Sequence, residues 1–337
     1  MLKVLELFGG IGACTKALKR LGVDFSVVDY VEIDKHAVNS YNAMNGTFFK
    51  PQNISQWDKN LETDLIMHGS PCQDFSLAGL QAGGSEGSGT RSSLMWETLR
   101  IVKKLKPRYV VWENVKNILS SRHKVIFDNY LRIMESLGYD NYYKILNAKD
   151  FGIPQNRERV FVVSIRKDLL KDLYPPQRVV LERDITDILD KDVDEKYFLD
   201  SNADTLSLFT STQAQMITSD GNIYRYIGSK VVDKFEVGDC ADISFPHGYN
   251  KGNRVFKGYC PCINTTTVKS FIVKLRTSKN EERIRKITSK ECWRLMGFDD
   301  EDFDKASKVC SDAQLFKQAG NSIVVDVLVA IFKNLLY

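Results

Sequence analysis

The first half of the chain alternates short apolar runs with amphipathic segments, and this alternation constrains the fold more than any other feature. Apolar runs bounded by turn residues predict buried strands, whereas apolar residues at helical spacing predict helices. The predicted strands are 2–8, 25–31, 64–69, 108–112, 142–146 and 159–165. The predicted helices are one that stops at Gly22, one over 93–105 that ends before Pro107, and one over 125–137 closed by Gly138. Strands that alternate with helices predict an α/β fold, with a mostly parallel sheet and helices on both faces.

The pattern changes at about residue 168. Residues 168–282 mix short strand-like pieces with Asp, Asn, Gly and Ser turns, which predicts a separate, smaller, irregular and mainly β domain. After Gly320, apolar residues return as a helical stripe from Ile323 to Leu335, and we expect this helix to pack on the N-terminal half. The expected domains are therefore residues 1–176 together with 310–337, and residues 177–309.

Composition excludes several classes of protein. With 337 residues, 43% hydrophobic and 27% charged, the chain resembles an ordinary globular protein that can bury an α/β core and a second domain. A net charge of +4 permits a nucleic-acid partner without requiring one. The N-terminus lacks the features of a signal peptide, and no apolar run approaches the roughly 20 residues of a membrane span. We expect a cytoplasmic protein without a membrane partner.

Seven cysteines in a chain without an export signal predict reduced thiols rather than a disulfide framework. One zinc site can be considered, formed by Cys240, His247, Cys260 and Cys262. Its CxC spacing and single distant histidine match no usual ligand pattern. We therefore expect no metal.

A glycine-rich turn, from Phe8 to Ala13, follows the first predicted strand. Such glycines let a ligand lie against the backbone at the carboxyl end of a strand, where open α/β sheets bind ligands. The dinucleotide pattern needs a further glycine where Thr15 stands, which disfavours NAD. Glu32 ends the second strand, where an acidic side chain can take ribose hydroxyls. These features alone fit a nucleotide site and a plain tight turn equally well.

Reactive side chains follow the next strands. Cys72 lies just after the third strand, in the run GSPCQ, although a cysteine standing alone is more often a small core residue. The fourth strand leads to Glu113, and a later turn supplies Arg157 and Arg159. Because ligands gather at the carboxyl ends of strands, we expect the thiol, the carboxylate and the two guanidinium groups to converge there.

This set of groups fits methyl transfer to carbon 5 of cytosine. Carbon 5 is a poor nucleophile until a thiolate adds to carbon 6, and neighbouring positive charge increases the thiolate fraction. A buried glutamate with a raised pKa can protonate nitrogen 3 of the ring and so assist the addition. One arginine can hold the carbonyl oxygen of the base while the other orients the glutamate.

The chain resembles the DNA (cytosine-5) methyltransferase family of bacterial and phage type, nearly from end to end. The motifs that carry the resemblance are LFGGIG, SPCQ, ENV, QNRER, RKITSKECWRLMGF at 285–298 and QAGNSIVVDVL at 318–328. The resemblance implies a Rossmann-like catalytic domain that binds S-adenosyl-L-methionine, a smaller target-recognition domain, and a target cytosine flipped out of duplex DNA.

The resemblance also implies a role for individual residues. Cys72 is the expected nucleophile, Glu113 the partner of nitrogen 3, and Arg157 with Arg159 the positioning pair. The expected cofactor residues are Phe8, Gly10, Ile11, Gly12, Glu32, Ile33, Asn53, Ile54, Pro71, Leu94, Asn321 and Ser322. Asn53 departs from the family, which usually has an aspartate for the adenine amino group. An amide oxygen accepts the same hydrogen bond, so we expect weaker but intact binding.

DNA contacts are expected in two places. Residues 74–92 directly follow the nucleophile and contain five glycines, which fits a lid that closes over DNA or a plain surface loop. Basic and aromatic residues over 177–284 fit target recognition or a solvated face. The expected DNA-binding residues are Gln73, Ser76, Arg91, Thr265 and Thr266.

The expected partner is double-stranded DNA, bound by a monomer. A cognate restriction endonuclease that acts separately, within a restriction-modification system, is a further expected partner. Three alternatives remain open at this point: a tRNA cytosine-5 methyltransferase, a catalytically silent DNA-binding regulator, and a nicotinamide dehydrogenase. The incomplete glycine pattern disfavours the last of these, and the intact Cys72, Glu113 and Arg159 disfavour the regulator.

Overall fold

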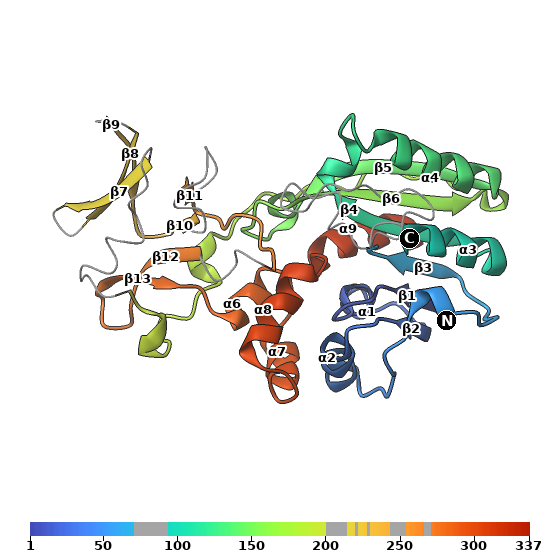
Figure 1. Ribbon diagram of the computed structural model, residues 1–337, viewed down its shortest axis with the longest axis horizontal. Helices are drawn as coiled ribbons and strands as arrows, with labels where there is room; N and C mark the ends of the chain where they lie inside the picture. The colour runs from blue at the N-terminus through green and yellow to red at the C-terminus, as the bar shows by residue number, and fades with distance from the viewer. Residues whose placement is uncertain (71–93, 200–213, 220–221, 228–229, 243–253, 266–270) are drawn as a thin grey trace.

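The protein has an α/β unit at one end and two small antiparallel sheets at the other, with short helices between them (Figure 1). This arrangement comes from a computed structural model of the chain. The structure describes residues 1–70, 94–199, 214–219, 222–227, 230–242, 254–265 and 271–337.

The α/β unit is built on a six-stranded sheet. In spatial order its strands are β2 (Phe25–Val31), β1 (Leu2–Leu7), β3 (Leu65–His68), β4 (Tyr109–Val115), β6 (Glu158–Arg166) and β5 (Tyr139–Asn147). The first four pair in parallel, whereas β6 is antiparallel to both of its neighbours. The prediction of a mostly parallel sheet is confirmed, with β6 as the reversed strand. β4 continues to Val115, so Glu113 lies within the strand and not after it.

Helices cover both faces of this sheet, as predicted. On one face lie α1 (Ala13–Arg20) and α9 (Val325–Leu336); on the other lie α3 (Met95–Leu105) and α4 (Lys124–Ser136). Successive strand residues point to opposite faces, so Val4 joins the first core and Leu5 the second. The remaining helix, α2 (Lys35–Asn45), lies beside β2, where the rings of Tyr30 and Tyr41 stack with centroids 4.0 Å apart.

The C-terminal helix packs on the N-terminal half, as its apolar stripe predicts. Leu328, Ile331 and Phe332 of α9 are buried in one core with Ala17 of α1. By length and composition the stretch Asp312–Leu336 could cross a membrane, but half of its most apolar window is buried inside the protein. Such burial is the property of a core helix, and here it closes the fold by joining the two ends of the chain.

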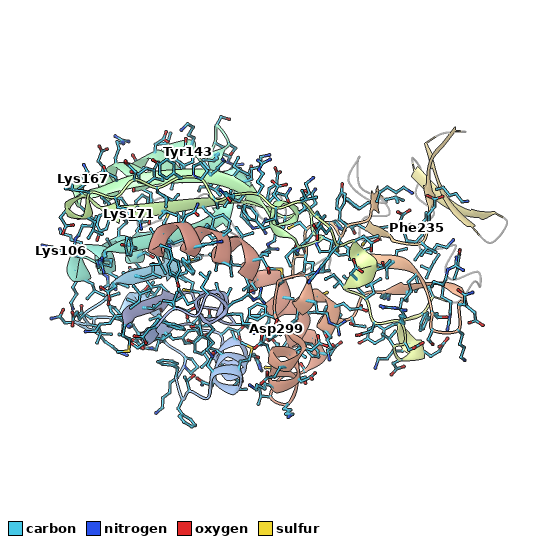
Figure 2. The ribbon with its side chains drawn as sticks, turned by 180° about the vertical axis from the view of Figure 1, so that it is seen from behind. Lys106, Tyr143, Lys167, Lys171, Phe235 and Asp299 are labelled. Carbon is cyan, nitrogen blue, oxygen red and sulfur yellow. The ribbon has the colours of Figure 1, made fainter. Side chains whose placement is uncertain are left out.

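The two small sheets are antiparallel. One has the order β11 (Arg254–Lys257), β10 (Asp239–Asp242), β12 (Phe271–Arg276) and β13 (Glu282–Lys286), and the other the order β7 (Ala214–Ser219), β8 (Asn222–Ile227) and β9 (Lys230–Phe235). Phe235, labelled in Figure 2, is buried with Ala241 and Ile272 in a small core of its own. The predicted mainly β character of this region is confirmed.

The segment 285–298 links the small sheets to the α/β unit through α6 (Ser289–Arg294). Thr288 caps the start of this helix and forms a capping box with Glu291. The Glu291 carboxylate also accepts two hydrogen bonds, at 2.5 and 2.9 Å, from the guanidinium of the fully buried Arg285. A buried carboxylate needs such partners, which explains the charged residues in this motif. Two further helices follow, α7 (Asp300–Ser307) and α8 (Asp312–Asn321).

Ion pairs tie α7 to the first helix of the chain. Lys16 Nζ lies 2.7 Å from Asp302, and Arg20 contacts both Asp299 and Asp326. Figure 2 labels Asp299, which lies where the late helices meet the N-terminal elements. Because α6 and α7 pack against the α/β unit in this way, we propose a domain boundary nearer to residue 287 than to the expected 309.

Candidate active site

A small hollow lies at the carboxyl ends of the parallel strands, where the two ends of the chain meet. Its lining comes from the end of β1 and the turn after it, the ends of β3 and β4, and the junction of α8 and α9. The lining residues are Glu6–Ile11, Ala13, Cys14, Met67, Gly69, Glu113 and Asn321–Ile323. The hollow thus collects Phe8, Gly10, Ile11, Asn321 and Ser322 from the predicted cofactor set, together with Glu113.

The glycines of the β1–α1 turn are required by its backbone. Gly10 and Gly12 have φ values of 53° and 82°, in the left-handed region that favours glycine. A Cβ on Gly12 would lie 2.6 Å from the ring of Tyr41, whereas a Cβ on Gly10 would meet nothing within 4 Å. Gly12 therefore serves packing, and Gly10 leaves open space at the mouth of the hollow. Phe8 shares the left-handed conformation, with φ 52°.

Glu32 directly follows β2, beside this turn. Its carboxylate accepts the backbone N–H of Gly10 at 3.1 Å and that of Asp34 at 2.8 Å. Burial raises the pKa of the Glu32 carboxyl, and these two hydrogen bonds offset part of the rise. The next residue, Ile33, is 68% exposed, so a large apolar side chain stands open next to a fixed carboxylate.

The second part of the predicted cofactor set lies close by. The backbone N–H of Gln52 donates to the Glu32 carbonyl at 2.7 Å, which brings Asn53 and Ile54 to the same edge. Asn53 is exposed and caps a short 3₁₀ turn (Ile54–Gln56) by accepting from the Ser55 N–H at 3.1 Å. Leu94, at the start of α3, packs with Phe8 against the same core cluster.

Glu113 and Arg159 form an ion pair at the edge of the hollow. In the β4–β6 register Val115 lies opposite Arg159 and Glu113 opposite Phe161, so the two charged residues are diagonal neighbours on one face. Arg159 Nε lies 3.1 Å from Glu113 Oε1, and both side chains are largely buried, at 16% and 12% exposed. Burial raises the pKa of the Glu113 carboxyl, and the charges of Arg159 and Arg157 offset only part of this rise.

Arg157 is placed differently from its predicted partner. Its guanidinium donates to the carbonyl oxygens of Ile263 at 2.5 Å, Gly320 at 3.2 Å and Ser322 at 2.7 Å. These carbonyls come from the small domain and from the α8–α9 junction. Arg157 therefore joins the turn before β6 to the small domain and to the α8–α9 junction.

Several predicted residues lie outside the described part of the chain: Pro71, Cys72, Gln73, Ser76, Arg91 and Thr266. The structure does show where the chain leads towards Cys72. Trp112 Nε1 donates to the Ser70 hydroxyl at 3.1 Å, and a Cβ on Gly69 would lie 3.8 Å from Glu113 Oε2. The chain therefore leaves β3 directly beside Glu113. Thr265, which is exposed, packs by its backbone against Gly320.

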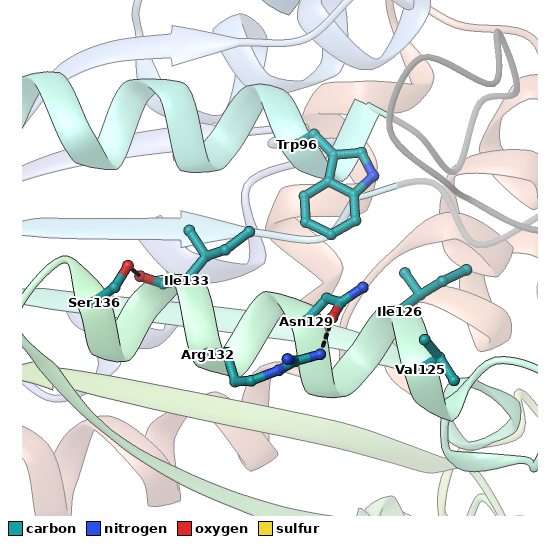
Figure 3. A pocket seen from close by; sticks show the side chains of 7 residues that line it. All are labelled: Trp96, Val125, Ile126, Asn129, Arg132, Ile133 and Ser136. Atoms are coloured by element: carbon teal, nitrogen blue, oxygen red, sulfur yellow. Dashed lines mark hydrogen bonds between the residues drawn. The ribbon is translucent and has the colours of Figure 1, made fainter.

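A second hollow lies on the outer surface between α3 and α4 (Figure 3). Its lining residues are Trp96, Val125, Ile126, Asn129, Arg132, Ile133 and Ser136. None of these seven is an acid, a thiol or a histidine, and the Arg132 guanidinium is already bonded to Asn129. This hollow lacks the groups needed for acid–base or nucleophilic chemistry, so the strand-end hollow is the candidate active site.

One residue at this site, Cys262, has no role among the sequence-based expectations except as a rejected zinc ligand. Its sulfur lies 3.6 Å from a guanidinium nitrogen of Arg157 and 3.6 Å from one of Arg159. Its position in the sequence, just before the threonine run at 265–267, is the signal that could have drawn attention to it.

Comparisons with known proteins identify the family of the chain. The family model described as C-5 cytosine-specific DNA methylase matches residues 2–337. The chain is 32% identical to the type II methyltransferase M2.ScrFI of Lactococcus lactis subsp. cremoris, covering 99% of each chain. It is 29% identical to the orphan methyltransferase M.SPRI of Bacillus phage SPR, covering all of this chain and 98% of that one. Among solved structures, the S. pombe Dnmt2 methyltransferase has the same fold, with a TM-score of 0.66 at 19% identity over 100% of this chain and 98% of that one.

The chain therefore belongs to the C-5 cytosine-specific DNA methylase family. Its activity is that of a DNA (cytosine-5-)-methyltransferase, an enzyme that takes a methyl group from a donor and places it on cytosine in DNA.

Proposed function

We propose that the methyl donor is S-adenosyl-L-methionine, bound in the strand-end hollow, and that Cys72, Glu113 and Arg159 activate the cytosine. The observation that carries this proposal is the largely buried Glu113–Arg159 pair, which lies on the rim of the same hollow that the β1–α1 turn lines. A donor pocket and an acid–cation pair next to one another are what transfer between two substrates requires.

The residues around the hollow fit the donor. Glu32, held by two backbone N–H groups, would accept hydrogen bonds from both ribose hydroxyls, and the exposed Ile33 would cover one face of the adenine. The Asn53 oxygen already accepts from Ser55 N–H, yet a carbonyl oxygen has a second lone pair for the adenine amino group. When bound, S-adenosyl-L-methionine supplies an electrophilic methyl group on a positively charged sulfur.

Glu113 in its protonated form would donate to nitrogen 3 of the cytosine ring. Removal of electron density there lets the Cys72 thiolate form a bond to carbon 6, and the displaced electron pair makes carbon 5 nucleophilic. After carbon 5 has taken the methyl group, loss of its proton restores the double bond and expels Cys72. Arg159 would hold Glu113 in place, and Arg157 would hold the backbone around the pair.

The target base must leave the DNA stack to reach this site, because neither face of carbon 6 is exposed inside a duplex. We propose that Gln73, Ser76 and Arg91, together with Thr265 and Thr266 of the small domain, contact the DNA around the flipped base. Thr265 supports this assignment by its place next to Gly320 at the edge of the hollow. We further propose that the enzyme acts as a monomer and that any cognate endonuclease acts separately.

The experiment is a covalent-trapping assay with duplex DNA that contains 5-fluorocytosine. Fluorine cannot leave carbon 5 as the proton does, so the wild-type protein should form a stable adduct that survives denaturing electrophoresis. Cys72→Ala should form no adduct and transfer no methyl group, yet should still bind S-adenosyl-L-methionine. Cys310→Ala, which removes a thiol distant from the hollow, is the control. Methyl transfer at the wild-type rate by Cys72→Ala would overturn the mechanism.

A further inference from the structure

Backbone hydrogen bonds fix the segment that carries Cys262 to the α/β unit. After β11 the chain runs along residues 154–156: Cys260 N–H donates to the Pro154 carbonyl and Asn156 N–H to the Cys260 carbonyl, each at 2.8 Å. The buried Gln155 side chain accepts from Ile263 N–H at 3.1 Å and donates to the Leu295 carbonyl at 2.7 Å. Cys262 lies between these two anchored residues, so its sulfur has a defined place.

That sulfur contacts both active-site arginines. The distances from Cys262 Sγ to nitrogens of Arg157 and Arg159 are both 3.6 Å, within the range of a hydrogen bond to sulfur. A different nitrogen of Arg159, Nε, is the one that meets Glu113. One guanidinium group therefore bridges a carboxyl group and a thiol, while its remaining nitrogen donates to the Glu158 carbonyl at 2.8 Å, and these contacts together fix its plane.

The Cys262 sulfur and the Glu113 carboxyl group both interact with the positive charge of Arg159. Burial by itself would raise the pKa of the Cys262 thiol, but the charges of Arg159 and Arg157 outweigh burial and lower it. A larger thiolate fraction at Cys262 neutralises part of the Arg159 charge. Less positive charge then remains to stabilise the Glu113 carboxylate, which favours the protonated carboxyl group that the reaction needs.

We propose that Cys262 is a positioning residue of the methyl-transfer reaction, which holds Arg159 against Glu113 and shares the charge of that arginine. The inference rests on the proposed roles of Glu113 and Arg159. It adds to them a residue from the small domain, so that the segment between β11 and β12 influences proton transfer as well as DNA contact.

Few other ionisable groups face this sulfur among the residues that the structure describes. From β6 and the turn before it come Arg157 and Arg159, and from its own segment comes Cys260. Glu113 of β4 meets the other side of Arg159. The α8–α9 junction contributes backbone carbonyls, which do not titrate. The pH dependence of variants at Cys262 therefore follows from the balance among these groups.

The first test is the pH profile of kcat for Cys262→Ser, Cys262→Ala and Cys262→Asp. Activity falls as rising pH removes the Glu113 proton. The Ser and Ala variants lack the thiol that shares the Arg159 charge, so Arg159 lowers the Glu113 pKa further and this fall should occur about one pH unit lower, the size typical of a neighbouring charge. The Asp variant restores a fixed negative charge and should return the fall to the wild-type position or above it.

The decrease in kcat relative to the wild type is a second measurement on the same variants. Cys262→Ala should lower kcat about tenfold, as expected for a lost hydrogen bond to a charged group, with KM for DNA nearly unchanged. Cys310→Ala, which removes a half-buried thiol that contacts Ser40 and the His36 carbonyl, should keep the wild-type profile. A wild-type pH profile in Cys262→Ala, or an Asp variant as shifted as the Ala variant, would overturn the proposal.

The second test needs no methyl transfer, so its result does not depend on the proposed function. In a Cys72→Ala background, the rate of iodoacetamide alkylation at Cys262 is followed against pH by mass spectrometry, with Cys310 as the internal reference. Cys262 should titrate below an ordinary thiol, and Arg159→Ala should move its titration to higher pH by about one unit. An unchanged titration would remove the charge-sharing argument, even if Cys72 and Glu113 act as proposed.

Discussion

A carboxyl group that donates a proton near neutral pH needs surroundings that oppose its ionisation, and Glu113 has them. Its side chain is largely buried, and the single ion pair that Arg159 makes with it offsets only part of the desolvation. The arginine fixes the orientation of the carboxyl group, while burial still favours the protonated form. This balance at one residue is the basis of the proposed mechanism.

Glu113→Gln tests that balance directly. The amide keeps the shape of the side chain but cannot transfer a proton, so kcat should fall by about 10²- to 10⁴-fold, the usual contribution of general acid–base catalysis. Fluorescence anisotropy of labelled duplex DNA should show nearly unchanged binding. Glu158→Gln is the matched control, because Glu158 adjoins Arg159 in sequence but is exposed and pairs with Lys116 at 3.0 Å. A similar loss in both variants would contradict a specific role for Glu113.

Glu6 shows the same effect in a residue that supports the hollow. It is fully buried, and burial raises its pKa from 4.5 to about 7, even though Thr15 and Tyr41 donate hydrogen bonds to it. A raised carboxyl pKa means that the folded state binds the proton more tightly than the unfolded state. The stability that Glu6 contributes is then fully present below about pH 4.5 and is lost as the pH rises through about 7.

Glu6→Gln should remove this loss. At about pH 4 the variant and the wild type should unfold at similar urea concentrations, whereas at about pH 8 the variant should be more stable by up to about 3 kcal/mol, from about 1.4 kcal/mol for each unit of pKa shift. Urea unfolding curves at the two pH values give the measurement. Glu62→Gln, at an exposed carboxyl group, should follow the wild type. A difference between variant and wild type that does not grow with pH would contradict the assigned cause.

Among the residues of the site, sequence reasoning could find those whose place follows from strand ends. Glu113 and Arg159 are expected to meet because reactive side chains gather where strand ends meet, and the structure brings them together. Arg159 reaches that edge because β6 begins there and runs antiparallel to β4. Cys262 could not be found in that way. It reaches the arginines only through the docking of residues 260–263 along residues 154–156, and no local pattern encodes that contact.

The positions of the strands and helices were predictable from the sequence, but the direction of β6 was less evident. Apolar runs and helical stripes are local properties, so β1 to β4, α1, α3, α4 and α9 lie within a few residues of the expected ranges. Direction depends on the connection between strands. The link from Asn147 to Glu158 is too short for a crossover helix, and that is the physical reason why β6 returns antiparallel to β5.

The contact between α8 and the small domain depends on Gly320. In a helix, alanine is favoured over glycine by about 1 kcal/mol, so propensity alone predicts that Gly320→Ala stabilises the protein. A Cβ there would instead lie 2.6 Å from the Asn264 carbonyl carbon and 2.7 Å from the Thr265 nitrogen, and backbone atoms cannot move cheaply. We expect a loss of about 1–3 kcal/mol in unfolding free energy and a clear fall in kcat.

Gly46→Ala is the control for this prediction. Gly46 has φ 66° with nothing within 4 Å of its Cβ position, so alanine there should cost about 1–2 kcal/mol through backbone strain alone. Urea unfolding and methyl-transfer assays would be run on both variants. The Gly46 variant should lose stability but keep its kcat. Equal activity in the two variants would show that the 264–265 contact does not support the site.

The stability of the α/β unit depends on α9, the last helix of the molecule. Phe332 and Leu335 of α9 are fully buried in the core that α1 and the sheet share, so deletion of residues 325–337 removes one wall of that core. Loss of several large buried side chains costs more than the about 5–15 kcal/mol that stabilises a typical protein. The truncated chain should lack a cooperative thermal transition by circular dichroism. Deletion of the exposed Tyr337 alone should change little, and a folded 1–324 fragment would refute the prediction.

The hollow is lined both by the turn after the first strand and by the junction before the final helix. The two parts lie far apart in the sequence, near residues 10 and 322, so the hollow exists only once the segments between them have folded and brought both parts together.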